Sequence, residues 1–334
     1  MDTFVKREPQ SPLNIRLLIP LVELATKSSL DERQLSDKAS GILKSRLVKS
    51  KDVPTTALRD EVEPVLREVH QRAQRSHAPD ALGVLSQASL YLCRILVSLN
   101  EEDVALAVYQ ESFDDYMSRK ASPLAFSFFQ DWARRFPALG WKLRHQVLES
   151  SSKAVNMYRR CQAFQLLQII LNQPDKVCMP FVVGTQSTVA HSHPQGEEPA
   201  VIVTFHEALQ KTILDLITLS VDDDRGLSLA QTKDLLKLVL ACIRQTRKTT
   251  ETVSIQVWDP AAWKALHDQL SSSNRFKSSS SVLNMCRQVE STAAQCKQAV
   301  GGKRKAGLDE ATETDPSKKS NRKKQKKSKS QYGF

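Results

Sequence analysis

The chain has 334 residues, 40% of them hydrophobic and 25% charged, which is enough for one long or two short globular units. Its formal net charge is +11, and its 10 glycines are too few for a turn-rich sandwich or barrel or for a glycine-rich dinucleotide loop. The sequence has no apolar run of about 18 residues and no cleavable signal pattern, so we expect neither a membrane span nor secretion.

Apolar residues recur at helical spacing along the first half of the chain. The first predicted helix covers residues 12–27, where Pro20 should kink or end it. The stretch Ser29–Glu32 has the form of a capping box that starts the next helix. Further helices are predicted from residue 54 to 73, from 79 to 99, and over 102–118, 123–136, 138–152 and 153–172.

Residues 173–203 interrupt this pattern with several Pro and Gly residues. We predict a long exposed loop, whose flanking apolar runs Val177–Val183 and Ala200–Phe205 can pair as a small hairpin. Helices resume over 204–220 and 227–246, the latter behind a second capping box at Ser228–Gln231. Two shorter helices are predicted over 259–270 and 279–299.

The alternation of helices and short connections predicts an all-α fold, an irregular armadillo or HEAT-like α-solenoid. The predicted organisation is a helical-repeat region at 1–172, an exposed loop at 173–203, a helical region at 204–300 and a disordered basic tail at 301–334. Since the letters show no strict repeat, a single irregular helical bundle is the competing architecture.

The basic charge is concentrated in the tail. Residues 301–334 hold 11 Lys and Arg against 4 Asp and Glu, whereas residues 1–300 hold 37 against 33. Two basic clusters separated by a spacer are the format of a bipartite nuclear import signal, and the same charges would neutralise nucleic-acid phosphates without reading sequence. The predicted targeting and contact residues are Lys303, Arg304, Lys305, Lys318, Lys319, Arg322, Lys323, Lys324, Lys326 and Lys327.

Other polar clusters are better explained structurally. Asp222–Asp224 precede a predicted helix, where acids favour the positive end of the helix dipole. His191 and His193, with Cys178 and His206 nearby in sequence, lack the spacing of a closed zinc site, so no metal is predicted. His70, His77 and His145 are expected at the surface, and the six cysteines are expected as reduced, mostly buried thiols.

The chain shows no nucleophile elbow, no phosphate-binding loop and no paired-carboxylate signature for two-metal chemistry, so we predict no catalytic residue and no cofactor. Aromatic residues gather in one stretch, Ser127–Trp141. We expect it to form a corner between two helices. Phe128, Phe129 and Trp132 would pack inward there, and Pro137 and Gly140 would make the turn. A partner-docking patch is the alternative.

Several of these segments resemble the C-terminal part of the Myb-binding protein 1A / DNA polymerase phi family of nucleolar proteins. The resemblance covers roughly residues 12–172, and the tail in character only. It is carried by Asn14–Leu24, Lys38–Leu43, Leu85–Leu92, Ser127–Trp132 and Arg159–Leu167. Because family members are usually much longer, the resemblance implies that this chain is the C-terminal portion of a larger solenoid.

The resemblance also implies an armadillo-like protein of the nucleus and nucleolus that acts in ribosomal RNA transcription, ribosome biogenesis and transcription regulation. We therefore expect a non-enzymatic scaffold whose partners are nucleolar or transcription proteins, a nuclear import receptor, and ribosomal DNA or RNA bound non-specifically. A transcriptional co-regulator is one alternative. A DNA-directed DNA polymerase, as the family name suggests, is another, although no residue here carries that activity.

Overall fold

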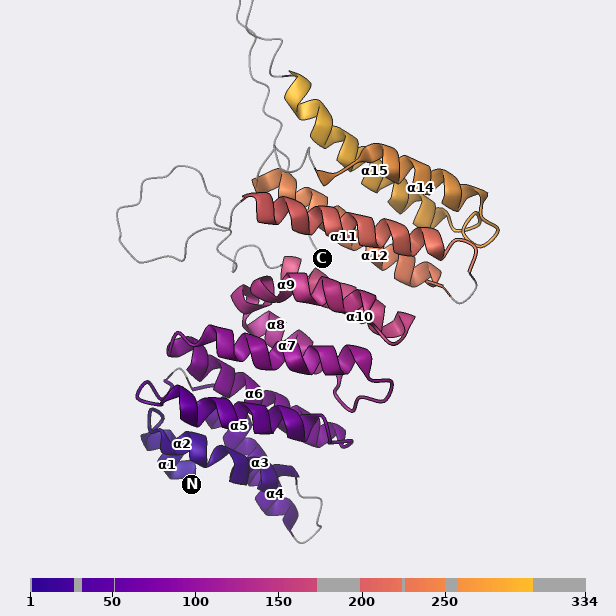
Figure 1. Cartoon of the computed structure of the whole chain (residues 1–334). Coiled ribbons are helices and arrows are strands. Elements are labelled where there is room, and N and C mark those ends of the chain that lie inside the picture. Colours follow the sequence, from indigo (N-terminus) through magenta and orange to yellow (C-terminus); the bar gives the residue numbers. More distant parts are fainter. Residues whose placement is uncertain are drawn as a thin grey trace, which may run out of the picture.

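The computed structural model describes residues 2–26, 32–50, 52–172, 199–223, 226–249 and 257–302, and every element in these ranges is helical (Figure 1). The predicted hairpin run Val177–Val183, the first capping serine Ser29 and the whole tail beyond residue 302 lie outside the described residues. Within them, the all-α prediction is confirmed.

Short helices form the N-terminal end. They are α1 (Asp2–Arg7), α2 (Leu13–Arg16), α3 (Leu18–Thr26), α4 (Arg33–Ile42) and the π-helix η2 (Leu43–Leu47). The predicted helix over residues 12–27 is broken at Leu17, so that Pro20 falls in the first turn of α3. A first turn tolerates proline because its N–H groups have no partner within the helix.

The central part of the chain forms longer helices. They are α5 (Arg59–Ala73), α6 (Pro79–Ser98), α7 (Glu102–Ser118), α8 (Phe126–Arg135), α9 (Pro137–Ser152) and α10 (Met157–Leu171). Proline begins α6 and α9, and the Asn156 side chain caps α10 by accepting from the Arg159 N–H at 2.9 Å. The predicted positions of these helices are confirmed to within a few residues.

The last helices are α11 (Pro199–Leu219), α12 (Leu229–Thr249), α14 (Pro260–Ser272) and α15 (Ser280–Gly302). The second capping box is confirmed: the Ser228 N–H donates to Gln231 Oε1 at 2.8 Å, and the Gln231 N–H donates to Ser228 Oγ at 3.2 Å. One prediction is wrong. Ala200–Phe205 is not a strand of a hairpin but the beginning of α11, because Ile202, Phe205 and Leu209 continue the helical spacing into the core.

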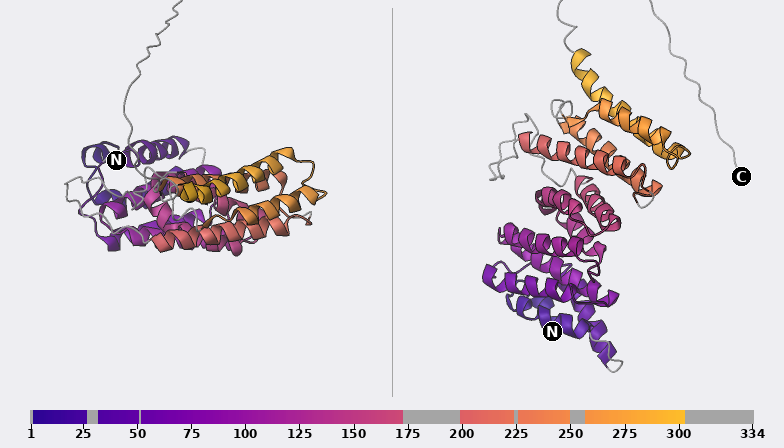
Figure 2. Two further views of the ribbon diagram at one scale, coloured as in Figure 1. Left: turned by 90° about the horizontal axis from the view of Figure 1, so that it is seen from above. Right: turned by 45° about the vertical axis from the view of Figure 1, so that its right-hand side comes forward.

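The helices stack in two layers. α5, α7, α9, α11 and α14 follow one another in the first layer, and α6, α8, α10, α12 and α15 follow one another in the second (Figures 1 and 2). Between α9 and α11 the contact is made by side chains, with the His145 and Phe205 rings 5.1 Å apart. Each helix contacts near neighbours only, which is the arrangement of an α-solenoid rather than of a single bundle.

The turn between α6 and α7 joins a helix of the second layer to a helix of the first. Asn100 has a φ of 60°, the Glu101 N–H donates to the Leu96 carbonyl at 2.9 Å, and the Asn100 N–H donates to the Val97 carbonyl at 3.1 Å. These two bonds make a Schellman motif with Asn in the left-handed position, which Asn tolerates better than most residues. The motif ends α6 and turns the chain directly into α7.

Helix α6 is long and apolar enough to cross a membrane by length and composition. About two thirds of its apolar window is buried, however, because α6 packs against α3, α5, α7 and α8. A core helix of a helical repeat passes the same test, so this finding is weak support for a membrane span.

Candidate interaction surfaces

The two layers carry opposite formal charges. The second layer, α6, α8, α10, α12 and α15, has 12 Lys and Arg and four Asp and Glu, a net charge of +8. The first layer, α5, α7, α9, α11 and α14, has 7 Lys and Arg and 13 Asp and Glu, a net charge of −6. We call the second layer the basic side of the solenoid and the first layer the acidic side.

Helix α12 is the main source of the basic side. Leu235, Leu236, Val239 and Ile243 are buried against the neighbouring helices. The opposite face carries a row of cations, of which Lys233 is half-buried and Lys237, Arg244 and Arg247 are exposed. Asp234 is the one acid in α12, and it accepts from the Lys237 ammonium at 2.7 Å. We call Lys233, Lys237, Arg244 and Arg247 the α12 basic row.

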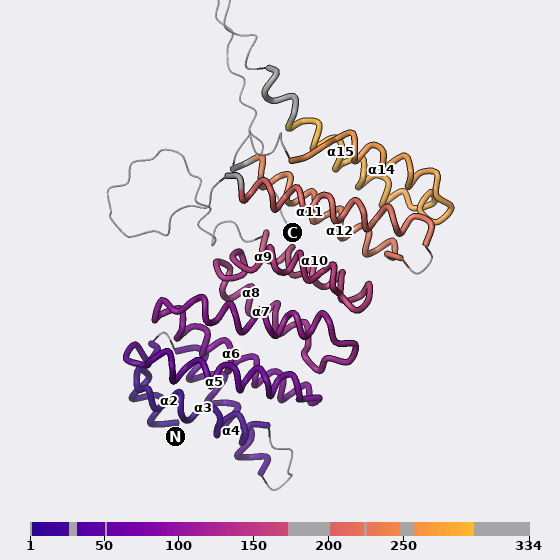
Figure 3. The backbone as a smooth tube through the Cα atoms, in the orientation of Figure 1, coloured from indigo at the N-terminus to yellow at the C-terminus, as the bar shows by residue number. Residues whose placement is uncertain are grey.

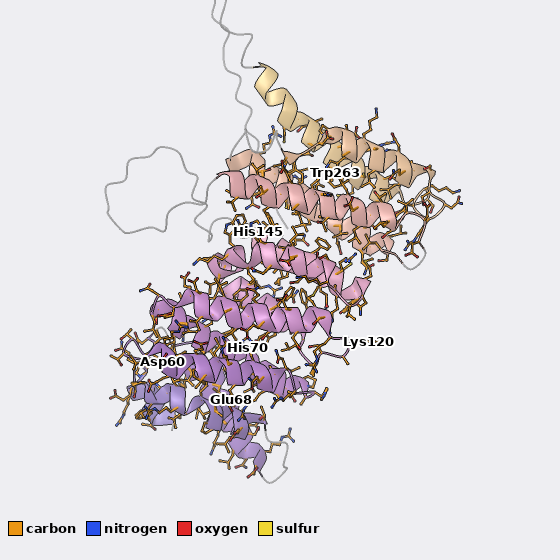
Figure 4. All side chains as sticks on the ribbon, viewed as in Figure 1. Asp60, Glu68, His70, Lys120, His145 and Trp263 are labelled. Atoms are coloured by element: carbon orange, nitrogen blue, oxygen red, sulfur yellow. The ribbon has the colours of Figure 1, made fainter. Side chains whose placement is uncertain are left out.

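Ion pairs organise the acidic side. Arg67 of α5 bridges Glu63 at 2.9 Å and Glu111 of α7 at 2.7 Å, and its hydrogen bond is the main cause that lowers the pKa of Glu63. Arg72 likewise bridges Glu68 at 2.6 Å and Glu23 of α3 at 2.8 Å. Figure 4 shows Glu68 on α5. Each exposed pair contributes little stability, but together they satisfy the arginines of this face within the chain.

An apolar groove lies at the N-terminal end, between α3, α4 and η2. It has a volume of about 620 Å³, and Leu21, Leu24, Leu35 and Ile42 line it. Leu35 is 53% exposed, although most leucines of this chain are in the core. The charged residues that line the groove are Lys38, Arg46 and Asp2, and Arg46 pairs with Asp2 at 3.0 Å.

The predicted targeting and contact residues, from Lys303 to Lys327, lie outside the described residues, so their prediction stays a prediction. His191, His193 and Cys178 also lie outside them, whereas His206 is buried in α11 and donates from Nδ1 to the Ile202 carbonyl at 2.8 Å. No group of three or more His, Cys, Asp or Glu side chains in the described ranges is arranged to hold a metal ion.

The helix-dipole role predicted for Asp222–Asp224 is not supported, because the first turn of α12 holds no acid. Asp222 and Asp223 are exposed in the connection that follows α11, and Asp224 lies outside the described residues. Asp114 accepts from the Ser150 hydroxyl at 2.6 Å, and Asp115 pairs with Arg119 at 3.3 Å. Neither pair of acids converges on a common point.

The aromatic stretch forms the predicted corner. Phe128, Phe129 and Trp132 are buried, and the chain turns at Phe136 between α8 and α9. The prediction that Gly140 helps to make the turn is wrong, because Gly140 lies inside α9. A Cβ there would be 3.2 Å from Ile170 Cγ1, so the glycine lets α9 and α10 approach closely.

His70 was predicted at the surface, and this prediction is wrong. Its ring is buried between α5, α6 and α7, with Nδ1 2.7 Å from the Ser112 hydroxyl and Nε2 2.8 Å from the Ser89 hydroxyl (Figure 4). Burial lowers the pKa of His70 to about 3, so the ring is neutral near pH 7. The signal in the sequence was its spacing, four residues after Leu66 and three before Ala73 on the apolar stripe of α5. His77 and His145 are exposed, as expected.

The described cysteines, Cys93, Cys161, Cys242, Cys286 and Cys296, are free and buried. Burial raises the pKa of both Cys93 and Cys242 to about 12. These two thiols are therefore protonated and unreactive at neutral pH. The prediction of reduced, buried thiols is confirmed for these five residues.

Comparison with known proteins finds one relationship. A family model described as Myb-binding protein 1A-like, TPR repeats, matches residues 8–294. The match extends beyond the segments that carried the resemblance and includes both helical regions. No curated protein and no solved structure matches the chain.

Proposed function

Because the chain belongs to the Myb-binding protein 1A-like family of helical-repeat proteins, we propose that it is a non-enzymatic nucleolar scaffold in ribosomal RNA transcription and ribosome biogenesis. Helical repeats of this kind have a general role in protein interaction. In the proposed function, the helical body binds protein partners, and the basic tail provides nuclear import, nucleolar retention and non-specific affinity for ribosomal RNA or DNA.

The observation that supports protein binding most directly is the groove between α3, α4 and η2. Its floor is apolar, and Lys38 and Arg46 stand at its border with one acid, Asp2. The complementary occupant is an amphipathic helix of a partner protein that places two or three large apolar side chains in the groove and acidic residues along its edges. Exposed apolar surface of this kind is otherwise a liability for a folded chain.

Replacing Leu24 and Leu35 together by Asp should abolish capture of the partners that bind the groove, because the change places two charges on its floor. Tagged full-length chains would be purified from cells with and without the substitutions, and the bound proteins identified. Replacing the exposed Val155 and Tyr158 by Asp is the matched control, since both lie on the distant α9–α10 connection and α10. Equal capture by the unchanged chain, the groove variant and the control variant would contradict protein binding at the groove.

The identity of the captured proteins separates the scaffold from its main alternative. Ribosome-assembly factors support the scaffold, whereas sequence-specific transcription factors support a transcriptional co-regulator. Both functions use the same helical body, so the partner is the property that distinguishes them.

Replacing the ten predicted targeting residues, Lys303 to Lys327, by Gln should release the chain from the nucleolus. The physical reason is that import receptors and nucleic-acid phosphates both bind this tail through its positive charge. Imaging of the tagged full-length chain checks the expectation. Unchanged nucleolar accumulation would contradict the proposed role of the tail.

A further inference from the structure

The α12 basic row lies on the helix that carries five of the twelve Lys and Arg of the basic side. α12 lies between α10 and α15 in the second layer (Figure 3). The Arg247 guanidinium donates to the Gln295 side chain of α15 at 3.2 Å. No carboxylate of the described residues pairs with Arg244 or Arg247. These cations therefore differ from Arg67 and Arg72 on the acidic side, which are paired within the chain.

We propose that the outer face of the second layer, centred on Lys237, Arg244 and Arg247, binds the sugar-phosphate backbone of a nucleic-acid duplex. This inference rests on the proposed nucleic-acid binding and adds to it a rigid site in the folded body. The tail would then supply diffuse attraction, and the α12 basic row would fix the position of the solenoid on the duplex.

The dimensions of the row suit a phosphate backbone. Lys237 and Arg247 are ten positions apart, which is about 15 Å along a helix. Phosphates of one strand rise about 3.4 Å each along the duplex axis, so the row is long enough to contact more than one of them. Arg244 and Arg247 can each bind a phosphate through two parallel N–H groups.

The surroundings favour a duplex over a single strand. Proteins that bind single strands stack the bases on exposed aromatic side chains. The aromatic residues Phe128, Phe129, Trp132 and Phe164 of this layer are instead buried. Tyr158 is exposed, but it lies at the start of α10, away from the end of α12 that carries Arg244 and Arg247.

The surroundings also favour nucleic acid over an acidic protein. Protein interfaces are typically centred on large apolar anchors and are depleted in lysine. On the exposed face of α12 the one large exposed apolar side chain is Leu229, at the first position of the helix. The neighbouring helix α10 contributes Gln165 and Gln168, whose neutral amides can donate to phosphates.

The test replaces Lys237, Arg244 and Arg247 by Gln in the full-length chain and measures binding to a fluorescent RNA duplex over a range of salt concentrations. Loss of three phosphate contacts should weaken binding at least tenfold at about 0.1 M salt. The slope of log K against log salt should become shallower by between two and three, since each contact contributes about 0.9. A DNA duplex and a single-stranded oligo(U) of equal length identify the preferred nucleic acid, and preference for oligo(U) would overturn the duplex assignment.

The matched control replaces Arg75, Lys211 and Lys264 by Gln. These residues are exposed, and Lys211 and Lys264 lie in α11 and α14 of the first layer, so the control makes the same change in net charge elsewhere. Equal weakening by both triple variants would overturn the proposal, because net charge alone would then explain the effect. Circular dichroism of each variant confirms that the helices are retained.

A third chain, with the ten tail residues replaced by Gln, separates this inference from the proposed function. If that chain loses binding and the α12 variant binds normally, the proposed role of the tail stands and the α12 site is refuted. If the α12 variant loses binding and the tail variant does not, the α12 site stands and the tail does not carry the affinity. Weaker binding by both the tail variant and the α12 variant supports the two sites acting together.

Discussion

The free energy of unfolding is expected to fall by roughly 5 kcal/mol between pH 7 and pH 4.5, because two buried histidines must be protonated. Burial lowers the pKa of His70 to about 3 and that of His206 to about 4, whereas both titrate near 6.5 when unfolded. Between these values the unfolded chain binds protons that the folded chain excludes. Stability is therefore fully present above about pH 6.5 and is lost as the pH falls toward 4, at roughly 2–3 kcal/mol for each histidine by pH 4.5.

Both rings are held in ways that make protonation costly. His70 contacts Tyr109 and Phe128 edge-on, at 4.6 and 5.1 Å between ring centroids, and the nearby Arg67 also disfavours a second positive charge. His206 lies near Arg144 and His145, which act in the same direction.

Urea denaturation at pH 7.5, 5.5 and 4.5 measures this dependence. Replacing both His70 and His206 by Gln should lower stability at pH 7.5 but flatten its decline toward pH 4.5. The control replaces the exposed His77 by Gln, which should leave the decline as it is. If the stability of the double variant at His70 and His206 falls with pH in parallel with that of the unchanged chain, the two histidines do not cause the decline.

Replacing Trp132 by Ala should destabilise the chain by about 3–5 kcal/mol, the range for deleting a buried aromatic side chain. Trp132 is completely buried, and its ring stacks on Tyr109 at 4.4 Å between centroids. The Tyr109 hydroxyl is 2.6 Å from the Ser89 hydroxyl, which in turn binds His70. Removing the indole therefore opens a cavity beside the polar network that joins α5, α6 and α7.

Thermal unfolding followed by circular dichroism checks this expectation, with a fall in Tm on the order of 10 °C. Tyr158→Ala is the matched control, since that ring is 63% exposed and its loss should change stability by less than about 0.5 kcal/mol. A Trp132→Ala chain as stable as the control would show that α8 does not hold these repeats together.

Much of the fold could be predicted from local signals. The capping box at Ser228–Gln231, the first-turn Pro79 and the inward packing of Phe128, Phe129 and Trp132 follow from short-range chemistry that needs no tertiary context. The predictions were wrong where the type of a residue was given more weight than its spacing along the chain. Ala200–Phe205 has the β-branched composition of a strand, but α11 continues through it because its apolar residues recur every three or four positions.

His70 was misplaced for a related reason. Histidine is intermediate in burial, and composition gives no indication that two serines from other helices will bind its ring. Ser89 and Ser112 are 19 and 42 residues away, on α6 and α7. Their approach depends on how three helices pack, which spacing along one helix does not reveal.

The sequence by itself determined the helices, their ends, and the net charge of each one, because capping, proline placement and apolar spacing act within a few residues. The sequence was also enough to identify the family, because the motifs that carry the resemblance lie within single helices. Only the tertiary structure decided that α6, α8, α10, α12 and α15 lie in one layer and their acidic counterparts in the other. Helices that are not adjacent in the chain become neighbours when successive helical hairpins stack to bury their apolar faces, and that stacking alone gathers the charges into a basic and an acidic side.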